Sequence, residues 1–238
     1  MSKDKEVSTP LAGHFKLNIK QYPTSEKDKE DLKKFPYVSA VGSLMYAMVC
    51  TRPDITHAVG VVNRYLSNPG KEHWNAVKWI LRYLKGTSRL CLCFGNGKTM
   101  LDGYTNADMA GDLDNRKSTS GYLMIFAGGA VSWQSKLQKC IALSSMEAEY
   151  IATTEACKET LWLQKFVQEL VLDSKLLILE NVHTNDNGAD MFTKALPKKK
   201  LLFCRQEADL VEPPNELEGE IVGCGPAHFW GQPTYANA

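Results

Sequence analysis

The sequence has no surplus of charge of either sign and no long apolar run. Its 238 residues carry 28 Lys and Arg against 27 Asp and Glu, so the overall charge gives no support to a strongly basic nucleic-acid binder. No run of about 18 apolar residues occurs, and the first residues are charged, which argues against a membrane span or a signal peptide. We therefore expect an intracellular protein, cytoplasmic or nuclear, that has no membrane partner.

The sequence also lacks a disulfide framework. Its seven cysteines are an odd number scattered through apolar stretches, which fits a reducing compartment. Cys91 and Cys93 form the one close pair, and no second Cys/His pair completes a zinc site. We interpret these thiols as small buried hydrophobes.

Sharply marked enzyme motifs are absent as well. The chain contains no G-x-x-x-x-G-K-[ST] phosphate loop, no H-E-x-x-H zinc helix and no G-x-S-x-G nucleophile elbow. These absences remove the commonest nucleotide hydrolases, zinc proteases and serine hydrolases. Any catalysis must therefore come from the scattered carboxylates.

The first third of the chain predicts a small helical unit. Residues 1–34 mix charge, proline and short apolar pieces, and we expect a linker or a poorly ordered arm there. Residues 35–88 show apolar positions at helical spacing, with Ser39 and Asp54 as expected N-caps and Gly86 just past the last helix. The three expected helices are Ala40–Cys50, Asp54–Leu66 and Glu72–Lys85.

The middle of the chain changes to strand patterns and then to a long helix, which predicts an α/β domain with a mixed sheet over residues 89–197. A capping box, Ser144 with Glu147, marks the start of the long helix. Residues 198–238 are rich in Pro and Gly, and we expect a disordered tail. The expected strands are Leu90–Phe94, Met100–Thr105, Tyr122–Ala127, Val131–Gln134, Cys140–Leu143 and Leu176–Val182, and the expected helices are Ser144–Leu172 and Gly188–Leu196.

Three carboxylates stand where chemistry could occur. Asp108 closes an expected strand, and Glu149 and Asp190 lie at the starts of two expected helices. If they converge at one edge of the sheet, they can hold divalent ions over a phosphodiester. Acidic residues near a helix start are also the ordinary response to the helix dipole. The residues alone leave both interpretations open.

Cations and hydroxyls beside these carboxylates suggest contact with a nucleic-acid backbone. The polar stretch 112–120 contains Arg116, Lys117 and Ser118, and Lys136 and Lys139 follow it. Such side chains hold phosphates. The alternative is a solvated turn, and Lys198–Lys200 is similarly a solubilising run or a phosphate site.

Several longer strings resemble plant copia-type retrotransposon Pol polyproteins, in the order that the family has them. Residues 41–87 resemble the reverse-transcriptase segment that follows the polymerase palm, and residues 103–152 and 188–194 resemble two parts of the RNase H domain. The strings are Val41–Tyr46, Thr51–Ile55, Pro69–Trp74, Ile80–Thr87, Gly103–Asp114, Arg116–Tyr122, Ser132–Lys136, Ala142–Ala152 and Gly188–Lys194.

This resemblance implies a truncated RNase H-like mixed sheet after a thumb-like or connection-like helical unit. RNase H of this family uses four acids and two Mg²⁺ (or Mn²⁺) ions to cut the RNA strand of an RNA–DNA hybrid. Glu149 matches the second acid and Asp190 the fourth, but the first position is Asn106. The region of the third acid is missing, as if a middle block had been deleted. Other parts of a Pol polyprotein are possible partners.

The departures predict a weakened metal site. Asparagine keeps the shape of aspartate without the charge on which a hard cation depends. Asp108 faces the same way as Asn106 and is a candidate replacement ligand, although two residues along a strand is about 6.6 Å. We also expect 176–182 to fill the slot of the lost parallel strand.

No Tyr-x-Asp-Asp motif occurs, so this chain cannot polymerise nucleotides. Three functional interpretations stay open at this point. The chain is a catalytically impaired RNase H-like remnant, a non-enzymatic nucleic-acid-binding module, or a pseudogene product with no stable fold.

Overall fold

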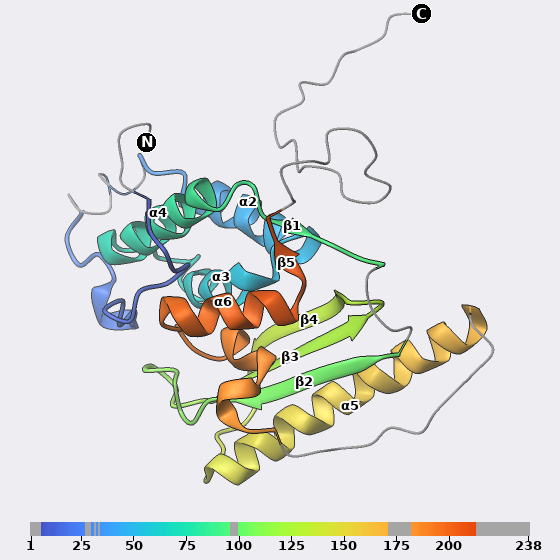
Figure 1. Cartoon of the computed structure of the whole chain (residues 1–238). Coiled ribbons are helices and arrows are strands. Elements are labelled where there is room, and N and C mark those ends of the chain that lie inside the picture. The colour runs from blue at the N-terminus through green and yellow to red at the C-terminus, as the bar shows by residue number, and fades with distance from the viewer. Residues whose placement is uncertain are drawn as a thin grey trace, which may run out of the picture.

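The chain folds into helices around a small antiparallel sheet (Figure 1). The computed structural model describes residues 6–26, 30, 32, 34–95, 100–170 and 182–212. Its helices are η1 (Ile19–Gln21), α2 (Tyr37–Cys50), η2 (Pro53–Ile55), α3 (Thr56–Asn63), α4 (Lys71–Gly86), α5 (Ser145–Leu170), η3 (Thr184–Asp186), η4 (Gly188–Phe192) and α6 (Lys198–Glu207). Its strands are β1 (Cys91–Leu92), β2 (Asp102–Ala107), β3 (Thr119–Phe126), β4 (Gly129–Leu137) and β5 (Leu210–Val211).

The helical unit forms where the apolar periodicity places it, but its caps differ from those expected. Helix α2 begins after Pro36 rather than at Ser39. Asp54 lies inside η2 and caps no helix, because its carboxylate is used elsewhere. Arg52 donates to both of its oxygens at 2.9 Å, and the Tyr83 hydroxyl donates to Oδ2 at 2.5 Å. This buried network ties the turn after α2 to α4 and explains why Arg, Pro and Asp stand together there.

Strands β2, β3 and β4 form an antiparallel sheet in sequence order. Side chains alternate along β3, so Tyr122 and Met124 face α5 while Leu123 faces the helical unit. The expected mixed sheet is not seen among the described residues, where every strand pair is antiparallel. The segment 176–182, expected to supply a parallel strand, lies largely outside the described residues.

The molecule has three layers, with α5 on one face of the sheet and η4, α6 and α3 on the other (Figure 1). Helices α2 and α4 lie beyond α3. The strand β1 leaves the helical unit and pairs with β5, the last described strand.

One hydrophobic core joins the helical unit to the sheet. It runs from Val41, Ile55 and Tyr83 in the helices to Leu123 in β3 and Phe192 in η4. The indole of Trp133 in β4 also donates to the carbonyl oxygen of Met48 in α2, at 2.9 Å. The two expected domains therefore share their interior.

Two segments expected to lack structure are ordered in part. Leu11 and Leu17 of the N-terminal arm are 5% exposed and belong to the shared core, so the expected loose arm is wrong for them. Residues 198–211 form α6 and β5 because Leu201 and Cys204 enter the same core. The expected disordered tail is wrong for that stretch, and 213–238 lie outside the described residues.

Two shorter expectations also need correction. Residues 140–143 form no strand, because Ile141 and Leu143 point into solvent and only Ala142 is buried. The last expected helix is the short 3-10 turn η4, which ends at Phe192. In the described part of the chain, none of the helices has the length and apolarity to cross a membrane.

Candidate functional site

The end of β2 and the turn η4 bring Asn106 against Asp190. The Asn106 Nδ2 atom donates to Asp190 Oδ1 at 2.6 Å and to Thr193 Oγ1 at 3.0 Å. Because a carboxylate only accepts hydrogen bonds, the atom that faces it must be the amide nitrogen. The first and fourth acid positions of the resemblance are thus neighbours, although one of them is an amide.

Gly121 in β3 and Asn187, the N-cap of η4, make this approach possible. Asn106 pairs with Gly121 in the sheet, and a Cβ atom on Gly121 would lie 2.5 Å from the Cβ of Phe192. Asn187 fixes η4 at the sheet edge, because its Nδ2 donates to the carbonyl of Thr105 and its Oδ1 accepts from the amide of Ala189. A glycine and an asparagine therefore set the distance between strand and turn.

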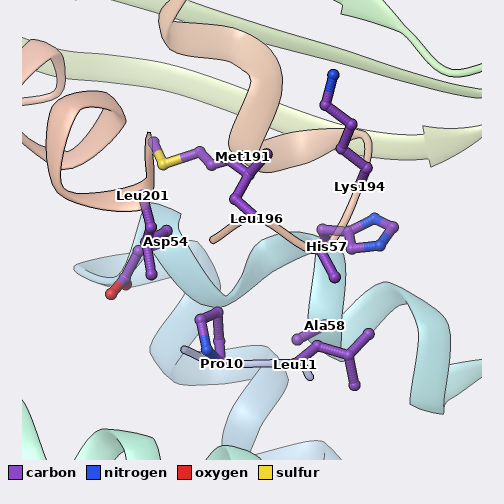
Figure 2. Close-up of a pocket in the computed structure, with 10 residues that line it drawn as sticks. Pro10, Leu11, Asp54, His57, Ala58, Met191, Lys194, Leu196 and Leu201 are labelled. Atoms are coloured by element: carbon purple, nitrogen blue, oxygen red, sulfur yellow. The ribbon is translucent and has the colours of Figure 1, made fainter. Parts of the chain in front are cut away.

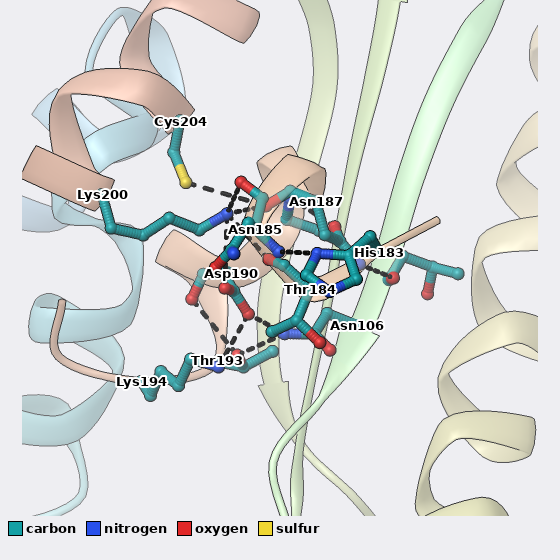
Figure 3. A network of polar contacts seen from close by, with 12 residues as sticks. Asn106, His183, Thr184, Asn185, Asn187, Asp190, Thr193, Lys194, Lys200 and Cys204 are labelled. Carbon is teal, nitrogen blue, oxygen red and sulfur yellow. Dashed lines mark hydrogen bonds and ion pairs between the residues drawn. The ribbon is translucent and has the colours of Figure 1, made fainter. Parts of the chain in front are cut away.

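Asp190 is surrounded by cations (Figure 3). The residue is 2% exposed, and Lys194 Nζ lies 2.8 Å from Oδ1 while Lys200 Nζ lies 3.6 Å from Oδ2. Two ammonium groups and one amide therefore satisfy this buried carboxylate from within the protein. Ligands of Mg²⁺ are oxygen atoms. The groups that face Asp190 are nitrogen donors, so they occupy the place of a cation beside the carboxylate and cannot themselves bind one.

Lys200 is the part of this network that the sequence did not indicate. Its ammonium donates to the carbonyl oxygens of Thr184, Asn185 and Asn187 at 2.9, 2.6 and 3.3 Å. The sequence left Lys198–Lys200 open between a solubilising run and a phosphate site. The Lys200 side chain is only 18% exposed, so the solubilising interpretation does not hold for it. Lys200 lies four residues before the buried Cys204 and so on the same side of α6, but this spacing does not indicate which group its ammonium would contact.

Asp108 lies just beyond β2 and serves the following loop. Its Oδ1 accepts from the amide of Thr119, and a Cβ on Gly111 would collide with its Oδ2. Burial raises the pKa of Asp108 above its usual value, and backbone hydrogen bonds from Thr119 and Gly111 partly offset this. The carboxylate is thus engaged in loop structure, and its role as a replacement ligand stays a prediction.

Glu149 is exposed near the start of α5, the helix on the other face of the sheet. The expected Ser144 cap is present, since the Glu147 amide donates to Ser144 Oγ at 3.1 Å. Across the described residues, no three His, Cys, Asp or Glu side chains are grouped so that they could hold a metal ion. The structure brings Asn106 and Asp190 together but assembles no metal cluster with Asp108 and Glu149.

Some of the residues expected to contact phosphates are exposed to solvent, and others are used within the fold. Arg116, Lys136 and Lys139 are exposed. Ser118 is buried, and its Oγ accepts from the amide of Ala110. Lys117 Nζ donates to the carbonyl of Lys139 at 2.8 Å, which holds this basic group together at the loop end of the sheet.

A narrow pocket lies on the helical side of η4, between η4, α3 and the N-terminal arm (Figure 2). Met191, Leu196 and Leu201 line it, with His57 on the opposite wall. Burial and the nearby Arg64 lower the pKa of His57 to about 4, and its Nδ1 atom is buried without a hydrogen-bond partner. The pocket is mainly apolar, so we assign it to packing.

Comparison with known proteins identifies the family. The chain is 53% identical to the retrovirus-related Pol polyprotein from transposon TNT 1-94 of Nicotiana tabacum, over 87% of this chain and 19% of that protein. It is 38% identical to the Pol polyprotein from transposon RE2 of Arabidopsis thaliana, over 70% of this chain and 11% of that protein. The chain belongs to the retrotransposon Pol polyproteins.

The Pol alignment supports the expected internal deletion. It extends over 247 residues, whereas 87% of 238 residues is about 207, so about 40 aligned positions are gaps in this chain. The chain spans less than a fifth of the length of these two Pol relatives.

A shorter relative carries a different name. Secreted RxLR effector protein 161 of Plasmopara viticola is 52% identical over 56% of this chain and 94% of its own length. No family model matches the chain, and no solved structure matches it.

Proposed function

We propose that this chain carries an RNase H-like domain of a copia-type Pol protein that has lost most of its metal-dependent hydrolysis of RNA in RNA–DNA hybrids. The observation behind the proposal is the Asn106 amide that donates to Asp190 at 2.6 Å. In the family this pair is two carboxylates, and Mg²⁺ or Mn²⁺ is the implied cofactor. Here the residues do not fit such an ion.

Charge explains why the loss should be large. Two divalent ions stabilise the attacking and leaving oxygens of a phosphodiester, and carboxylates hold these ions. At this site, Asn106 has an amide where the family has a carboxylate. The remaining carboxylate, that of Asp190, is paired with Lys194 and Lys200. The Pol alignment has about 40 more positions than this chain supplies, and the resemblance implies that the region of the third acid is among the missing ones.

Cleavage of a fluorescent RNA–DNA hybrid with Mg²⁺ or Mn²⁺ tests the proposal. We expect no cleavage by the parent chain or by Asn106→Asp. Asn106→Asp places two carboxylates against each other, so millimolar Mg²⁺ should raise its melting temperature while leaving that of the parent unchanged. Asn106→Leu, which adds no charge, is the matched control and should not respond to Mg²⁺.

Glu149→Gln gives the decisive contrast. If the parent cuts the hybrid and Glu149→Gln does not, the active site survives and the proposal is wrong. A metal response in the parent's melting temperature, lost in Asp190→Asn, would contradict it as well.

Exposed Arg116, Lys136 and Lys139 favour a second candidate, a non-enzymatic nucleic-acid-binding module. Such a module would bind an RNA–DNA hybrid with strong salt dependence and no cleavage. Lys136→Glu with Lys139→Glu should weaken binding at least tenfold, and Lys165→Glu on exposed α5 is the control. Equal binding by both variants would exclude this surface.

A further inference from the structure

A groove lies between the N-terminal arm and α4, on the outer side of the helical unit. It has a volume of about 310 Å³. The arm contributes His14 and Phe15, and α4 contributes Lys78, Trp79 and Arg82. In Figure 1, α4 lies beyond α3 from the sheet, so the groove is separate from the site at Asn106 and Asp190.

The aromatic wall of the groove is held in place by the fold. The indole nitrogen of Trp79 donates to the carbonyl of Thr9 at 2.8 Å. The rings of His14 and Phe15 meet the Trp79 ring edge-on, with centroids 5.4 and 5.6 Å away. Leu11, which is buried in the shared core, anchors the arm. Three rings are therefore fixed at one surface before any ligand arrives.

Cations follow the same face of α4. Lys71, Lys78, Arg82 and Lys85 are spaced seven, four and three residues apart, which places them along one side of a helix. The Arg82 guanidinium lies 4.8 Å from the centre of the Trp79 ring, and its Nε atom is buried without a partner among the described residues. Glu72 is the acid that lines the groove. The surface thus has a net positive charge and an unmet donor.

We propose that this groove binds single-stranded nucleic acid. Bases would stack against His14, Phe15 and Trp79, and phosphates would contact Lys78 and Arg82. Sequence-tolerant binding of single strands combines such aromatic platforms with a cationic track. A double helix keeps its bases stacked on each other, so it cannot use the three rings. The proposal does not depend on nuclease activity or on the basic group at Arg116, Lys136 and Lys139.

Fluorescence anisotropy of the full chain with a fluorescein-labelled oligo(dT) tests the proposal. Lys78→Glu with Arg82→Glu should weaken binding more than tenfold. With Lys78→Gln and Arg82→Gln, the slope of log K against log salt should fall by about 1.4, because each lost phosphate contact accounts for about 0.7. His14→Ala, an exposed change, should weaken binding without altering the melting temperature.

Two controls separate this surface from the other basic group. Lys165→Glu on α5 should bind oligo(dT) like the parent, and so should Lys136→Glu with Lys139→Glu. The proposal is overturned if the parent fails to bind oligo(dT), or if the α4 variants bind it as tightly as the parent. It is also overturned if the Lys136 and Lys139 changes, rather than the α4 changes, abolish binding.

Discussion

The two faces of the central sheet are built very differently. The face toward the helices joins a core that runs through α2, α3, α4, η4 and α6. Between the other face and α5, the described residues form a small hydrophobic cluster of Tyr122 and Met124 from β3 with Ala156 and Leu163 from α5. Helix α5 also leaves Tyr150 and Trp162 exposed. The first face therefore carries most of the folding free energy, and α5 is the more weakly attached layer.

The largest effect should come from Phe192, which is fully buried on the helical face. Phe192→Ala removes a ring from the shared core and should lower the free energy of unfolding by about 4 kcal/mol. Urea unfolding followed by circular dichroism measures this. A loss below about 1 kcal/mol would show that the two units do not depend on a common interior.

A slightly smaller loss should follow from the buried ion pair. Asp54→Asn leaves the Arg52 guanidinium buried without its carboxylate, which costs about 3 kcal/mol. Tyr83→Phe, which removes only the hydroxyl that donates to the same carboxylate, should cost about 1 kcal/mol. Equal losses in the two variants would contradict the assignment of the cost to the unpaired charge.

His57 should make the helical face sensitive to acid. Its folded pKa of about 4 lies below the usual 6.5, so the folded state binds fewer protons and loses stability as pH falls below 6.5. The loss should reach about 2 kcal/mol at pH 5. His57→Gln should remove this part of the pH dependence of unfolding, and an unchanged slope between pH 7 and 5 would count against it.

The smallest effects belong to the α5 face. Leu163→Ala should cost about 2 kcal/mol, because Leu163 is 7% exposed in the smaller cluster. Trp162→Ala is the matched control on the same helix. Trp162 is 59% exposed, so its removal should change stability by less than about 0.5 kcal/mol. A larger loss for Trp162→Ala than for Leu163→Ala would reverse the assigned orientation of α5.

Helical periodicity and turn residues were sufficient to predict α2, α4 and α5 and the hairpin strands, because these elements are specified locally. The helix and strand within 198–211 were not predicted, because Lys198–Lys200 and the later prolines dominate the local pattern. Leu201 and Cys204 in this stretch are buried by residues distant in the sequence. The prediction of a poorly ordered N-terminal arm was wrong for Leu11 and Leu17 for the same reason. A local sequence pattern does not show whether residues far away in the sequence will bury a segment.

The candidate site divides in the same way. The resemblance put Asn106 at the first acid position and Asp190 at the fourth, and the structure places the two side chains in contact. Periodicity and composition could not predict the ammonium of Lys200 beside Asp190, because that contact depends on how α6 returns over η4. The sequence was enough to identify the amide at position 106, but not the positive charge of Lys200 that faces Asp190.

The pairing of β1 with β5 brings the two ends of a long segment of the chain together. Residues 93–209 start and finish side by side, because Cys91 pairs with Val211 and Leu92 with Leu210. A segment attached in this way can be gained or lost during evolution as one block without displacing the chain on either side of it. The shared core opposes such independence, since removing the block would strip Leu123 and Phe192 from the helices. The two ends of the block lie side by side, but the stability of the helical unit depends on core residues that the block supplies.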